Sequence, residues 1–332
     1  MSNRSLIDKI DAFNSLKVLV IGDVILDAYY SGKVNRISPE APVPVLDIAK
    51  KEYRLGGAAN VALNLQALGA QPILCSIIGS DFAGRQVLDL MTTAQLSLDG
   101  IHSSASRITS VKTRLVSNNN QLIRMDEEQT DALLESDDSR LGKSIEDLID
   151  KNGPDAIVFE DYDKGVVGAR LITKVIAKAR TLGIPVSVDP KKNNFLSYAG
   201  ATLYKPNMKE LREGLNMPNL AANKDDLQNA FGLLNDIMPV ELVLFTLSSD
   251  GVFIASHEAS HLLETQTRDI SDVSGAGDSV ISVATCAKAV NASLEEIALL
   301  SNLAGGWVCQ FPGVVPITSD ALKSEVMKTN KP

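Results

Sequence analysis

Short apolar runs alternate with segments of helical periodicity along most of this chain. The runs have the length of buried strands, and Gly, Pro, Asp or Asn bounds each of them: 17–21, 72–78, 156–159, 184–188 and 242–246. Residues 58–68, 169–182 and 225–237 have the spacing of amphipathic helices. The alternation predicts an α/β fold with a central, mostly parallel β-sheet flanked by helices. Ligands of such sheets bind at the carboxyl ends of the strands.

Two segments depart from this alternation, at about 28–50 and 107–126. The first contains ISPEAPVPVLDI, where alternating Pro and Val favour extended edge strands over a helix. The second has VKTRLVS and QLIRM on either side of a turn at 118–120, which predicts a hairpin. We expect a small β-sheet that serves as a lid, a dimer surface or both, with a plain edge as the alternative. The whole chain, 1–332, is then one domain with this lid.

Composition and charge limit the classes of protein to which this chain can belong. The chain has 332 residues, a net charge of -9 and a pI near 5.0, which argue against a nucleic-acid surface but leave room for a local basic pocket. Three scattered cysteines predict buried free thiols and a reducing compartment. The N-terminus lacks the apolar core of a secretory signal, and no stretch has the length of a membrane span. We therefore expect a cytoplasmic protein.

The strongest chemical motif is DVSGAGDS at 272–279, which opens an apolar helix at about 276–289. Gly275 and Gly277 let backbone N–H groups converge at the helix start, where an anion is favoured. Asp278 would repel a phosphate that was only bound there. It fits a site where a hydroxyl loses its proton while it attacks phosphorus. The alternative is a glycine turn with Asp at the first helical turn.

Three further motifs have both structural and functional interpretations. Gly56, Gly57 and Asn60 in GGAAN allow close backbone approach and hydrogen bonds to sugar hydroxyls, or simply a tight strand-to-helix turn. Asp27 in GDVILD follows the first strand, where it is placed to accept hydrogen bonds from a sugar. The segment KPNMKE, 205–210, supplies a helix cap, a site for Mg²⁺ waters and phosphates, or both.

These motifs, with TLSSDG at 246–251, resemble the ribokinase (PfkB) family of sugar kinases in order and spacing over nearly the full length. The resemblance implies a ribokinase-like fold, Asp278 as catalytic base and an anion hole at Gly275, Ala276 and Gly277. It implies ATP and Mg²⁺, with Mg²⁺ bound through water at Glu210 and K⁺ near Asp272 and the Gly313 loop. The residues implied to bind ATP are Asn207, Met208, Lys209, Glu210, Thr246, Ser248, Gly251 and Asn302. Ser274 and Ser279 replace the family's commoner threonines, and a hydroxyl is kept.

Within that family, RISPEAPVPV and EDYDKG resemble kinases that phosphorylate D-glycero-D-manno-heptose 7-phosphate at C1, a step toward ADP-heptose for lipopolysaccharide. A sugar phosphate would then be the partner, with no adenylyltransferase domain in this chain and a homodimer formed through the lid. Alternatives are kinases for ribose, fructose or tagatose 6-phosphate, or a non-catalytic sugar-binding regulator. A NAD-dependent dehydrogenase is a more distant alternative, because this chain lacks the glycine fingerprint of that class. The candidates for binding the sugar phosphate are Asp27, Gly56, Gly57, Asn60, Arg36, Lys112, Arg114, Arg124, Asp161 and Lys164.

Overall fold

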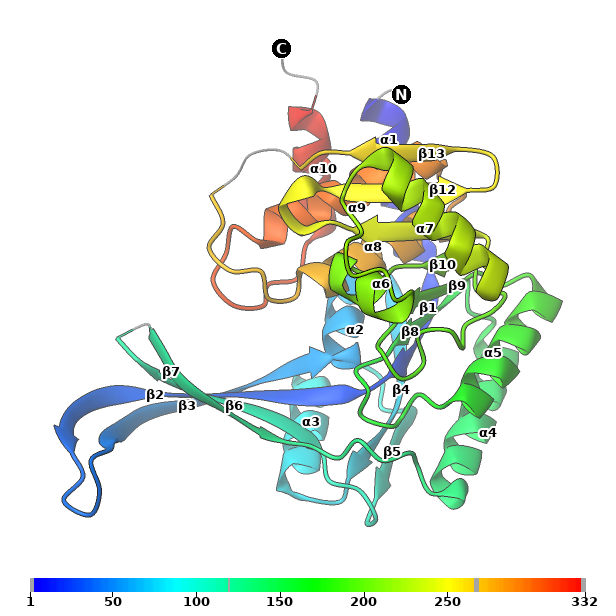
Figure 1. The fold of residues 1–332 in the computed structure, drawn as a ribbon. Coiled ribbons are helices and arrows are strands. Elements are labelled where there is room, and N and C mark those ends of the chain that lie inside the picture. Colours follow the sequence, from blue (N-terminus) through cyan, green and yellow to red (C-terminus); the bar gives the residue numbers. More distant parts are fainter. Residues whose placement is uncertain (1–2, 119, 266–268, 330–332) are drawn as a thin grey trace.

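A computed structural model describes residues 3–118, 120–265 and 269–329, and Figure 1 shows two β-sheets of very different size. The large sheet has the order β13-β12-β11-β10-β9-β8-β1-β4-β5, in which β12 and β13 are antiparallel additions to an otherwise parallel sheet. Its strands are β1 (Lys17–Gly22), β4 (Gln71–Gly79), β5 (Gly100–Ser104), β8 (Ala156–Glu160), β9 (Val186–Asp189), β10 (Leu203–Tyr204), β11 (Leu242–Thr246), β12 (Val252–Ser256) and β13 (Ser260–Leu263).

Helices cover both faces of this sheet and enclose two separate cores. One core is lined by α1 (Asn3–Ala12), α2 (Ala58–Ala67), α3 (Phe82–Thr93), α8 (Ala276–Ala289), α9 (Leu294–Val308) and α10 (Ser319–Lys328). The other is lined by α4 (Glu135–Asn152), α5 (Ala169–Leu182), α6 (Met208–Gly214) and α7 (Lys224–Ile237). Short 3₁₀ turns η1 (Phe13–Ser15) and η2 (Ser248–Asp250) follow α1 and β11. Alternate residues of β1 point into opposite cores, as a strand buried on both faces requires.

The small sheet has the order β3-β2-β6-β7 and projects from the body (Figure 1). Its strands are β2 (Val24–Ile37), β3 (Pro44–Gly57), β6 (Ser110–Ser117) and β7 (Asn120–Glu127). Both segments expected to form the lid are therefore strands, and β6 pairs with β7 as predicted. Residue 119, in the predicted turn, lies outside the described residues. The fold is the ribokinase-like α/β architecture that the sequence predicted.

The structure bears on two further expectations, which concern a membrane span and the state of the cysteines. None of the helices within the described ranges is long and apolar enough to span a membrane. The three cysteines are free, with Cys75 and Cys286 fully buried and Cys309 partly exposed. Burial in apolar surroundings raises the pKa of the two buried thiols, so they are inert core residues.

Candidate active site

Asp278 lies in the first turn of α8, three residues after a glycine that the backbone requires. Gly275 has φ 78°, the left-handed region that favours glycine. A Cβ at Gly275 would also lie 3.0 Å from Val314 Cγ1 and 3.2 Å from the Asn60 amide nitrogen. The Asp278 side chain points inward and the residue is only 6% exposed. The glycine-rich motif thus brings a buried carboxylate to a helix N-terminus, where N–H groups favour negative charge.

Both carboxylate oxygens of Asp278 are held by neighbouring side chains. The Asn60 amide donates to Oδ2 at 2.5 Å, and the Tyr162 hydroxyl donates to Oδ1 at 3.1 Å. Asn60 therefore orients the carboxylate in this structure, a role that differs from the sugar contact expected from the sequence. Burial raises the pKa of Asp278 above the ordinary aspartate value, while the hydrogen bonds from Asn60 and Tyr162 act in the opposite direction. The result is a fixed, partly desolvated base.

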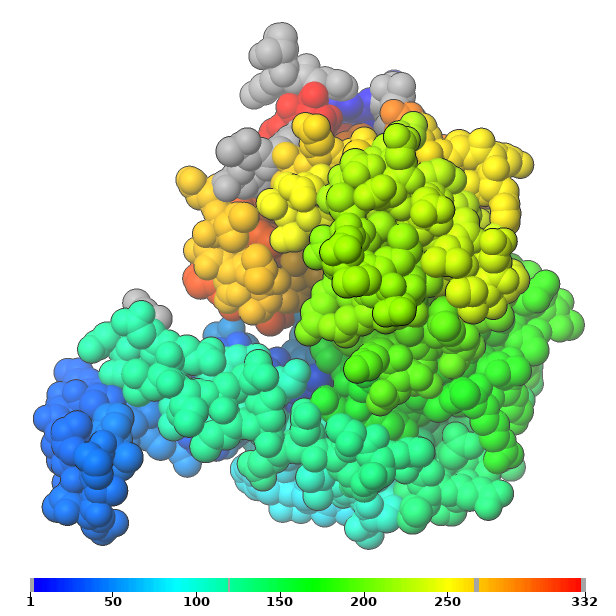
Figure 2. All heavy atoms as spheres, viewed as in Figure 1, coloured from blue at the N-terminus to red at the C-terminus, as the bar shows by residue number. Residues whose placement is uncertain are grey.

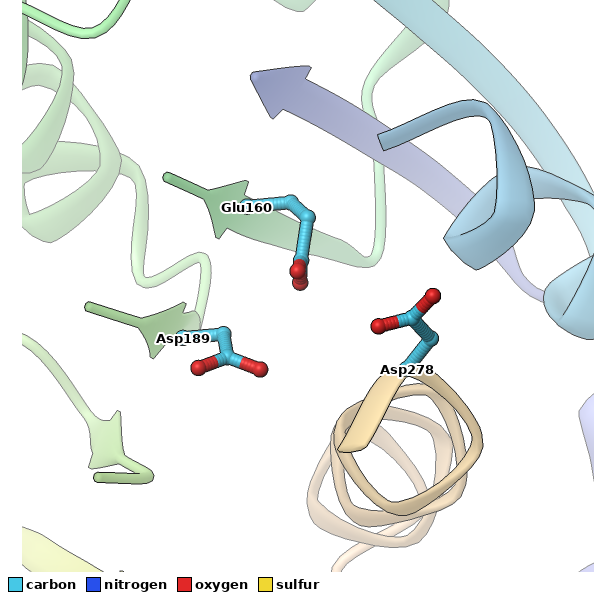
Figure 3. Close-up of side chains that lie close together, drawn as sticks. All are labelled: Glu160, Asp189 and Asp278. Carbon is cyan, nitrogen blue, oxygen red and sulfur yellow. The ribbon is translucent and has the colours of Figure 1, made fainter. Parts of the chain in front are cut away.

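Two more buried carboxylates face Asp278, as Figure 3 shows. Glu160 ends β8 and Asp189 ends β9, and one oxygen from each of the three carboxylates lies within 4.8 Å of the others. Lys205 follows β10 and its Nζ is 2.8 Å from Asp189 Oδ2. Burial and the charges of Asp189 and Asp278 raise the pKa of Glu160 well above its usual value. Sequence reasoning missed Glu160 and Asp189, although each follows a predicted strand at the end where ligands bind.

The segment 207–210 forms the helix cap that the sequence predicted. The side chain of Asn207 accepts from the Glu210 N–H at 3.0 Å, and Glu210 Oε2 accepts from the Asn207 N–H at 2.8 Å. The other oxygen of Glu210 is 2.6 Å from Lys191 Nζ. Met208 packs against the second core, whereas the Lys209 side chain is 80% exposed. Glu210 is thus linked to the cluster through Lys191, whose Nζ is also 3.6 Å from Asp189 Oδ1, and Lys209 faces solvent.

The other residues expected to bind ATP lie beyond the same edge of the sheet. Thr246 ends β11 and forms a β-bridge with Asn207. Ser248 and Gly251 both have positive φ, and a side chain at Gly251 would collide with the backbone of Leu263. Asn302 on α9 donates to the Glu264 carbonyl at 2.9 Å. The structure thus brings Asn207 and Thr246 together, while the Asn302 amide is engaged with the chain after β13.

One face of the small sheet carries the basic side chains that the sequence singled out. Asp27 and Lys112 are register neighbours, as are Arg114 and Arg124, so their side chains share this face. Arg114 forms an ion pair with Asp27 at 2.5 Å. A Cβ at Gly56 would collide with the Asp27 carboxylate, so glycine makes room for that carboxylate. Figure 2 shows an open notch between this sheet and the body of the molecule.

Arg54 on β3 joins this face, and sequence reasoning missed it. Arg54 is the register neighbour of Asp27, and its guanidinium lies 4.8 Å from the centre of the Tyr29 ring. The Arg114 guanidinium lies 5.1 Å from the same ring. Stacking on one aromatic ring holds both guanidinium groups in place. Each also pairs with a carboxylate, Arg54 with Glu52 at 2.6 Å and Arg114 with Asp27. No local motif marks Arg54, because its position depends on the pairing of β2 with β3.

Three of the predicted substrate residues are placed elsewhere by the structure. Arg36 pairs with Val45 near the far end of β2, nine residues or about 30 Å from Asp27 at the usual rise of a strand. Asp161 is 1% exposed, and its oxygens accept from Asn194, Tyr198 and the Asp163 N–H. Lys164 pairs with Glu128 at 2.9 Å rather than with Asp161. Arg36 therefore lies far from Asp27 along the small sheet, and the Asp161 carboxylate is occupied by its own neighbours.

Asp23, in the GDVILD segment, explains why the loop after β8 has its shape, a structural role that the sequence did not indicate. Its buried carboxylate accepts hydrogen bonds from the backbone N–H groups of Tyr162, Lys164 and Val166. Burial raises the pKa of Asp23, although these three hydrogen bonds oppose the shift. Asp23 follows β1, the strand beside β8, so these three hydrogen bonds join the segments that follow two neighbouring strands. It places Tyr162 against Asp278.

Asp272 links the glycine motif to the loop around Gly313, the two segments that the resemblance implied would lie together around K⁺. Its carboxylate accepts from the Ser274 N–H at 2.9 Å and from the Gly313 N–H at 3.0 Å. Burial alone would raise the pKa of Asp272, but these hydrogen bonds lower it below the ordinary value. The link fixes the approach to α8.

Comparison with known proteins identifies the family of the chain. Residues 15–320 match the pfkB family of carbohydrate kinases. The chain is 37% identical over 311 residues to the bifunctional protein HldE of Pelobacter propionicus, covering 92% of this chain and 62% of that protein. It is 36% identical over 329 residues to HldE of Citrifermentans bemidjiense, covering 98% of this chain and 66% of the relative. It thus spans less than two thirds of the length of these relatives.

Solved structures give the same fold at lower identity. Escherichia coli phosphofructokinase-2 in complex with potassium has a TM-score of 0.78 at 20% identity, covering 95% of this chain and 99% of that one. Arabidopsis thaliana ribokinase complexed with ribose and ATP has a TM-score of 0.72 at 16% identity, covering 94% and 98%. These likenesses show the fold. The family match over residues 15–320 shows that the chain belongs to the pfkB family of carbohydrate kinases, phosphotransferases whose acceptor is an alcohol group.

Proposed function

We propose that this protein uses ATP to phosphorylate a sugar phosphate, and that its substrate is D-glycero-β-D-manno-heptose 7-phosphate, phosphorylated at C1. The observation that carries the proposal is the buried Asp278 carboxylate, held by Asn60 and Tyr162 at a helix N-terminus. The small sheet brings a cation near it, because Lys112 Nζ is 5.5 Å from the centre of the Tyr162 ring. The similarity to HldE proteins and the RISPEAPVPV and EDYDKG segments support the heptose substrate.

In this mechanism Asp278 accepts the proton of the attacking hydroxyl. Tyr162 donates to Asp278 Oδ1 at 3.1 Å, the longer of the two bonds, so this oxygen is the one that an incoming hydroxyl would contact. Asn60 keeps Oδ2 in place at 2.5 Å. The N–H groups around Gly275, Ala276 and Gly277 stabilise the charge that develops on the transferred phosphoryl group. Positioning and charge stabilisation together account for the chemistry.

The nucleotide lies, in this proposal, against the edge formed by Asn207, Thr246 and Gly251. Thr246 and Asn207 are bridged, and the positive φ of Gly251 turns the chain back tightly after β11. Lys191, whose Nζ is 2.6 Å from Glu210, lies at the entrance to the carboxylate cluster, where a phosphate chain would pass. Asn302 on α9 borders the same region through its bond to Glu264.

A divalent cation suits the residues present. Mg²⁺ prefers carboxylate oxygens and water, and Glu160, Asp189 and Glu210 supply carboxylates here. When bound with ATP, Mg²⁺ neutralises phosphate charge. Glu210 has one oxygen in the helix cap and the other on Lys191, so it would act through water, as we expected. For K⁺, the Asp272–Gly313 link is the proposed surroundings.

The existing phosphate of the substrate is assigned to the basic face of the small sheet. Lys112, Arg114 and Arg124 share that face with Arg54. Arginine suits phosphate because its planar fork donates two hydrogen bonds. The Arg114–Asp27 pair keeps one donor oriented, and Asp27 has capacity left for a sugar hydroxyl. This arrangement favours a phosphorylated over a neutral sugar.

We also propose that the small sheet joins two copies of the chain. It carries a set of exposed apolar side chains that a monomer would leave in water: Ile37, Val43, Ile48, Leu122, Ile123 and Met125. A second copy would cover them, and it would also give Arg36, far from its own site, an anion to contact. Sedimentation should give twice the chain mass. A species with the mass of one chain, about 35.5 kDa, at micromolar concentration would contradict this.

A coupled ADP-release assay tests the substrate. The purified protein, with Mg·ATP, is offered the heptose 7-phosphate, fructose 6-phosphate, tagatose 6-phosphate, ribose and fructose. We expect turnover with the heptose 7-phosphate at a kcat/KM at least tenfold above that of any other sugar. Turnover only with an unphosphorylated sugar would overturn the assignment of the basic face. No turnover with any sugar would favour a non-catalytic sugar-binding regulator.

A further inference from the structure

A groove of about 810 Å³ runs along the amino ends of the central strands, at the edge of the large sheet opposite the candidate active site. Asp155, Pro185 and Glu241 line it, and they directly precede β8, β9 and β11. Asp155 and Glu160 are five residues apart along β8, which is about 16 Å at the usual rise of a strand. Small-molecule sites commonly have volumes of about 300–1,000 Å³. The groove is therefore a candidate binding site that is separate from the kinase site.

One wall of the groove carries an arginine without a partner. Arg180 lies in the last turn of α5, and it forms no ion pair or side-chain hydrogen bond with another described residue. The other basic residues of the same helix are paired: Arg170 with Asp138, Lys174 with Glu146 and Lys178 with Asp150. The guanidinium of Arg180 is thus available to an anion that enters the groove.

The loop before β10 leaves room for this guanidinium. Gly200 has φ 85°, in the left-handed region that favours glycine. A Cβ at Gly200 would lie 3.0 Å from a guanidinium nitrogen of Arg180 and 3.3 Å from its Cδ. The Gly200 N–H donates to the Pro239 carbonyl at 2.7 Å, which ties this loop to the segment before β11. Arg180 therefore lies against a loop that is itself held in place.

The ends of α5 and α8 lie on opposite faces of the sheet, and α8 contributes a second cation, Lys288. Lys288 Nζ is 2.6 Å from Glu241 Oε1, and the Glu241 side chain is 57% exposed. Because exposed ion pairs contribute little stability, an anion in the groove can compete for Lys288. The two carboxylates of the lining are engaged, Glu241 by Lys288 and Asp155 by the Lys17 N–H at 2.8 Å. The unengaged charge of the lining is thus the positive charge of Arg180, in a chain whose net charge is -9.

Much of the remaining lining is apolar. Ile184 and Pro185 follow α5, Pro239 precedes β11, and Ala289 ends α8. Apolar side chains of this kind cover the organic part of a ligand, whereas a bare inorganic ion gains nothing from them. An organic anion therefore suits the groove better than a free ion does.

We propose that this groove binds a phosphate monoester of nucleotide size, with its phosphate on Arg180 and Lys288 and its organic part on the apolar lining. A phosphate monoester carries nearly two negative charges at neutral pH, which matches two cations better than a carboxylate does. The planar fork of arginine donates two hydrogen bonds to one phosphate. The inference goes beyond the proposed function, since it involves neither Asp278 nor the small sheet and holds whichever sugar is phosphorylated.

Acetylation of lysine side chains, measured by mass spectrometry, locates the bound ligand. AMP is the probe, and it should protect Lys288 from acetylation in a saturable manner. Lys174, which is paired with Glu146 and lies outside the groove, should react at an unchanged rate. Because protection is measured at Lys288 itself, AMP bound at the ATP site does not contribute to it. Inorganic phosphate lacks the organic part, so it should need an at least ~10-fold higher concentration for the same protection.

Two arginine variants of α5 test the assignment. Arg180→Ala should raise the AMP concentration that half-protects Lys288 at least ~10-fold, since hydrogen bonds between charged groups contribute that much. Arg170→Ala removes a side chain that is 69% exposed and lies outside the groove, and it should leave this concentration unchanged. Because Arg180 has no partner among the described residues, Arg180→Ala should also melt within about 1.5 °C of the parent.

The proposal is overturned if AMP does not protect Lys288 in the parent, or if Arg180→Ala retains the parent's affinity. An equal loss in both variants would overturn it as well, because that loss would reflect general charge attraction. Protection by inorganic phosphate at the same concentration as AMP would contradict the role of the apolar lining. A clearly larger fall in the melting temperature of Arg180→Ala would show that Arg180 supports the fold instead of a ligand.

Discussion

Replacing Lys205 with methionine should destabilise the protein far more than an ordinary lysine substitution. Lys205 is 2% exposed, and its Nζ lies 2.8 Å from Asp189 Oδ2. Burial alone would lower the pKa of Lys205, but the Asp189 charge raises it overall, so the ammonium form is held in the folded state. Methionine keeps most of the side-chain volume and removes only the charge. Asp189 is then left buried beside Glu160 and Asp278 with no direct partner for Oδ2.

The size of the effect follows from this burial. Removing one partner of a buried ion pair costs about 3–5 kcal/mol, because the remaining charge is uncompensated. For a chain of 332 residues, the usual unfolding entropy per residue converts this into a fall in melting temperature of about 4–7 °C. Adding Glu160→Gln to Lys205→Met removes a repulsive neighbour. We expect the second change to restore at least about 1 kcal/mol, a coupling typical of groups in one network.

Differential scanning calorimetry in EDTA measures these shifts without interference from bound metal. Lys209→Met is the matched control, since Lys209 is 80% exposed and its distance to Glu213 is 3.8 Å. Such exposed pairs contribute about 0–1 kcal/mol, so the control should melt within about 1.5 °C of the parent. If Lys205→Met melted like the control, or if Glu160→Gln lowered its stability further, the description of the cluster as an undercompensated group of carboxylates would be refuted.

Three further changes test other parts of the site and its support. Tyr162→Phe removes the hydrogen bond to Asp278 Oδ1 and should lower kcat by roughly 10-fold, about 1.4 kcal/mol, with ATP affinity unchanged; an unaltered kcat would show that this bond does not orient the base. Gly56→Ala forces a methyl group against the Asp27 carboxylate and should raise the KM for the sugar at least ~10-fold in initial-rate assays, whereas an unchanged KM would remove Asp27 from the sugar pocket. Asp81 caps α3 and accepts hydrogen bonds from the N–H and the hydroxyl of Thr109. Burial alone would raise the pKa of Asp81, but these hydrogen bonds lower it overall. The stability that Asp81 contributes is therefore present above the ordinary aspartate pKa and is lost as the pH falls through the lowered pKa. Urea unfolding of Asp81→Asn should therefore show a smaller loss of stability below pH 4 than the parent, and parallel pH profiles would contradict this.

The fold was predictable because strong local patterns set it. The helix predicted at 276–289 and the strand predicted at 242–246 match α8 and β11 residue for residue. Their apolar faces are long and bounded by clear breaks. The strand predicted at 184–188 is found at 186–189, since β9 pairs with β8 from Val186 to Asp189 and the preceding Pro185 cannot donate to a ladder.

The site was only partly predictable, because its composition depends on strand order. Asp278 carries a local motif, and so it was found. Glu160 and Asp189 each look like an ordinary polar residue that ends a strand, and only the adjacency of β8 and β9 brings them together. Arg36 shows the opposite case: its sequence neighbourhood is distinctive, but the 14-residue strands β2 and β3 carry it far from Asp27. Local chemistry is readable from sequence, whereas distance across a sheet is not.

The most direct test of the central claim is the turnover of Asp278→Asn with Mg·ATP and the sugar phosphate that the parent uses. Asparagine keeps the shape and the contacts with Asn60 and Tyr162 in altered form, but it cannot take the hydroxyl proton. We predict that kcat falls at least ~10²-fold, the lower end for loss of a general base, while ATP binding measured by calorimetry stays within about twofold. A kcat within a few-fold of the parent's, with ATP binding intact, would contradict the assignment of Asp278 as the base.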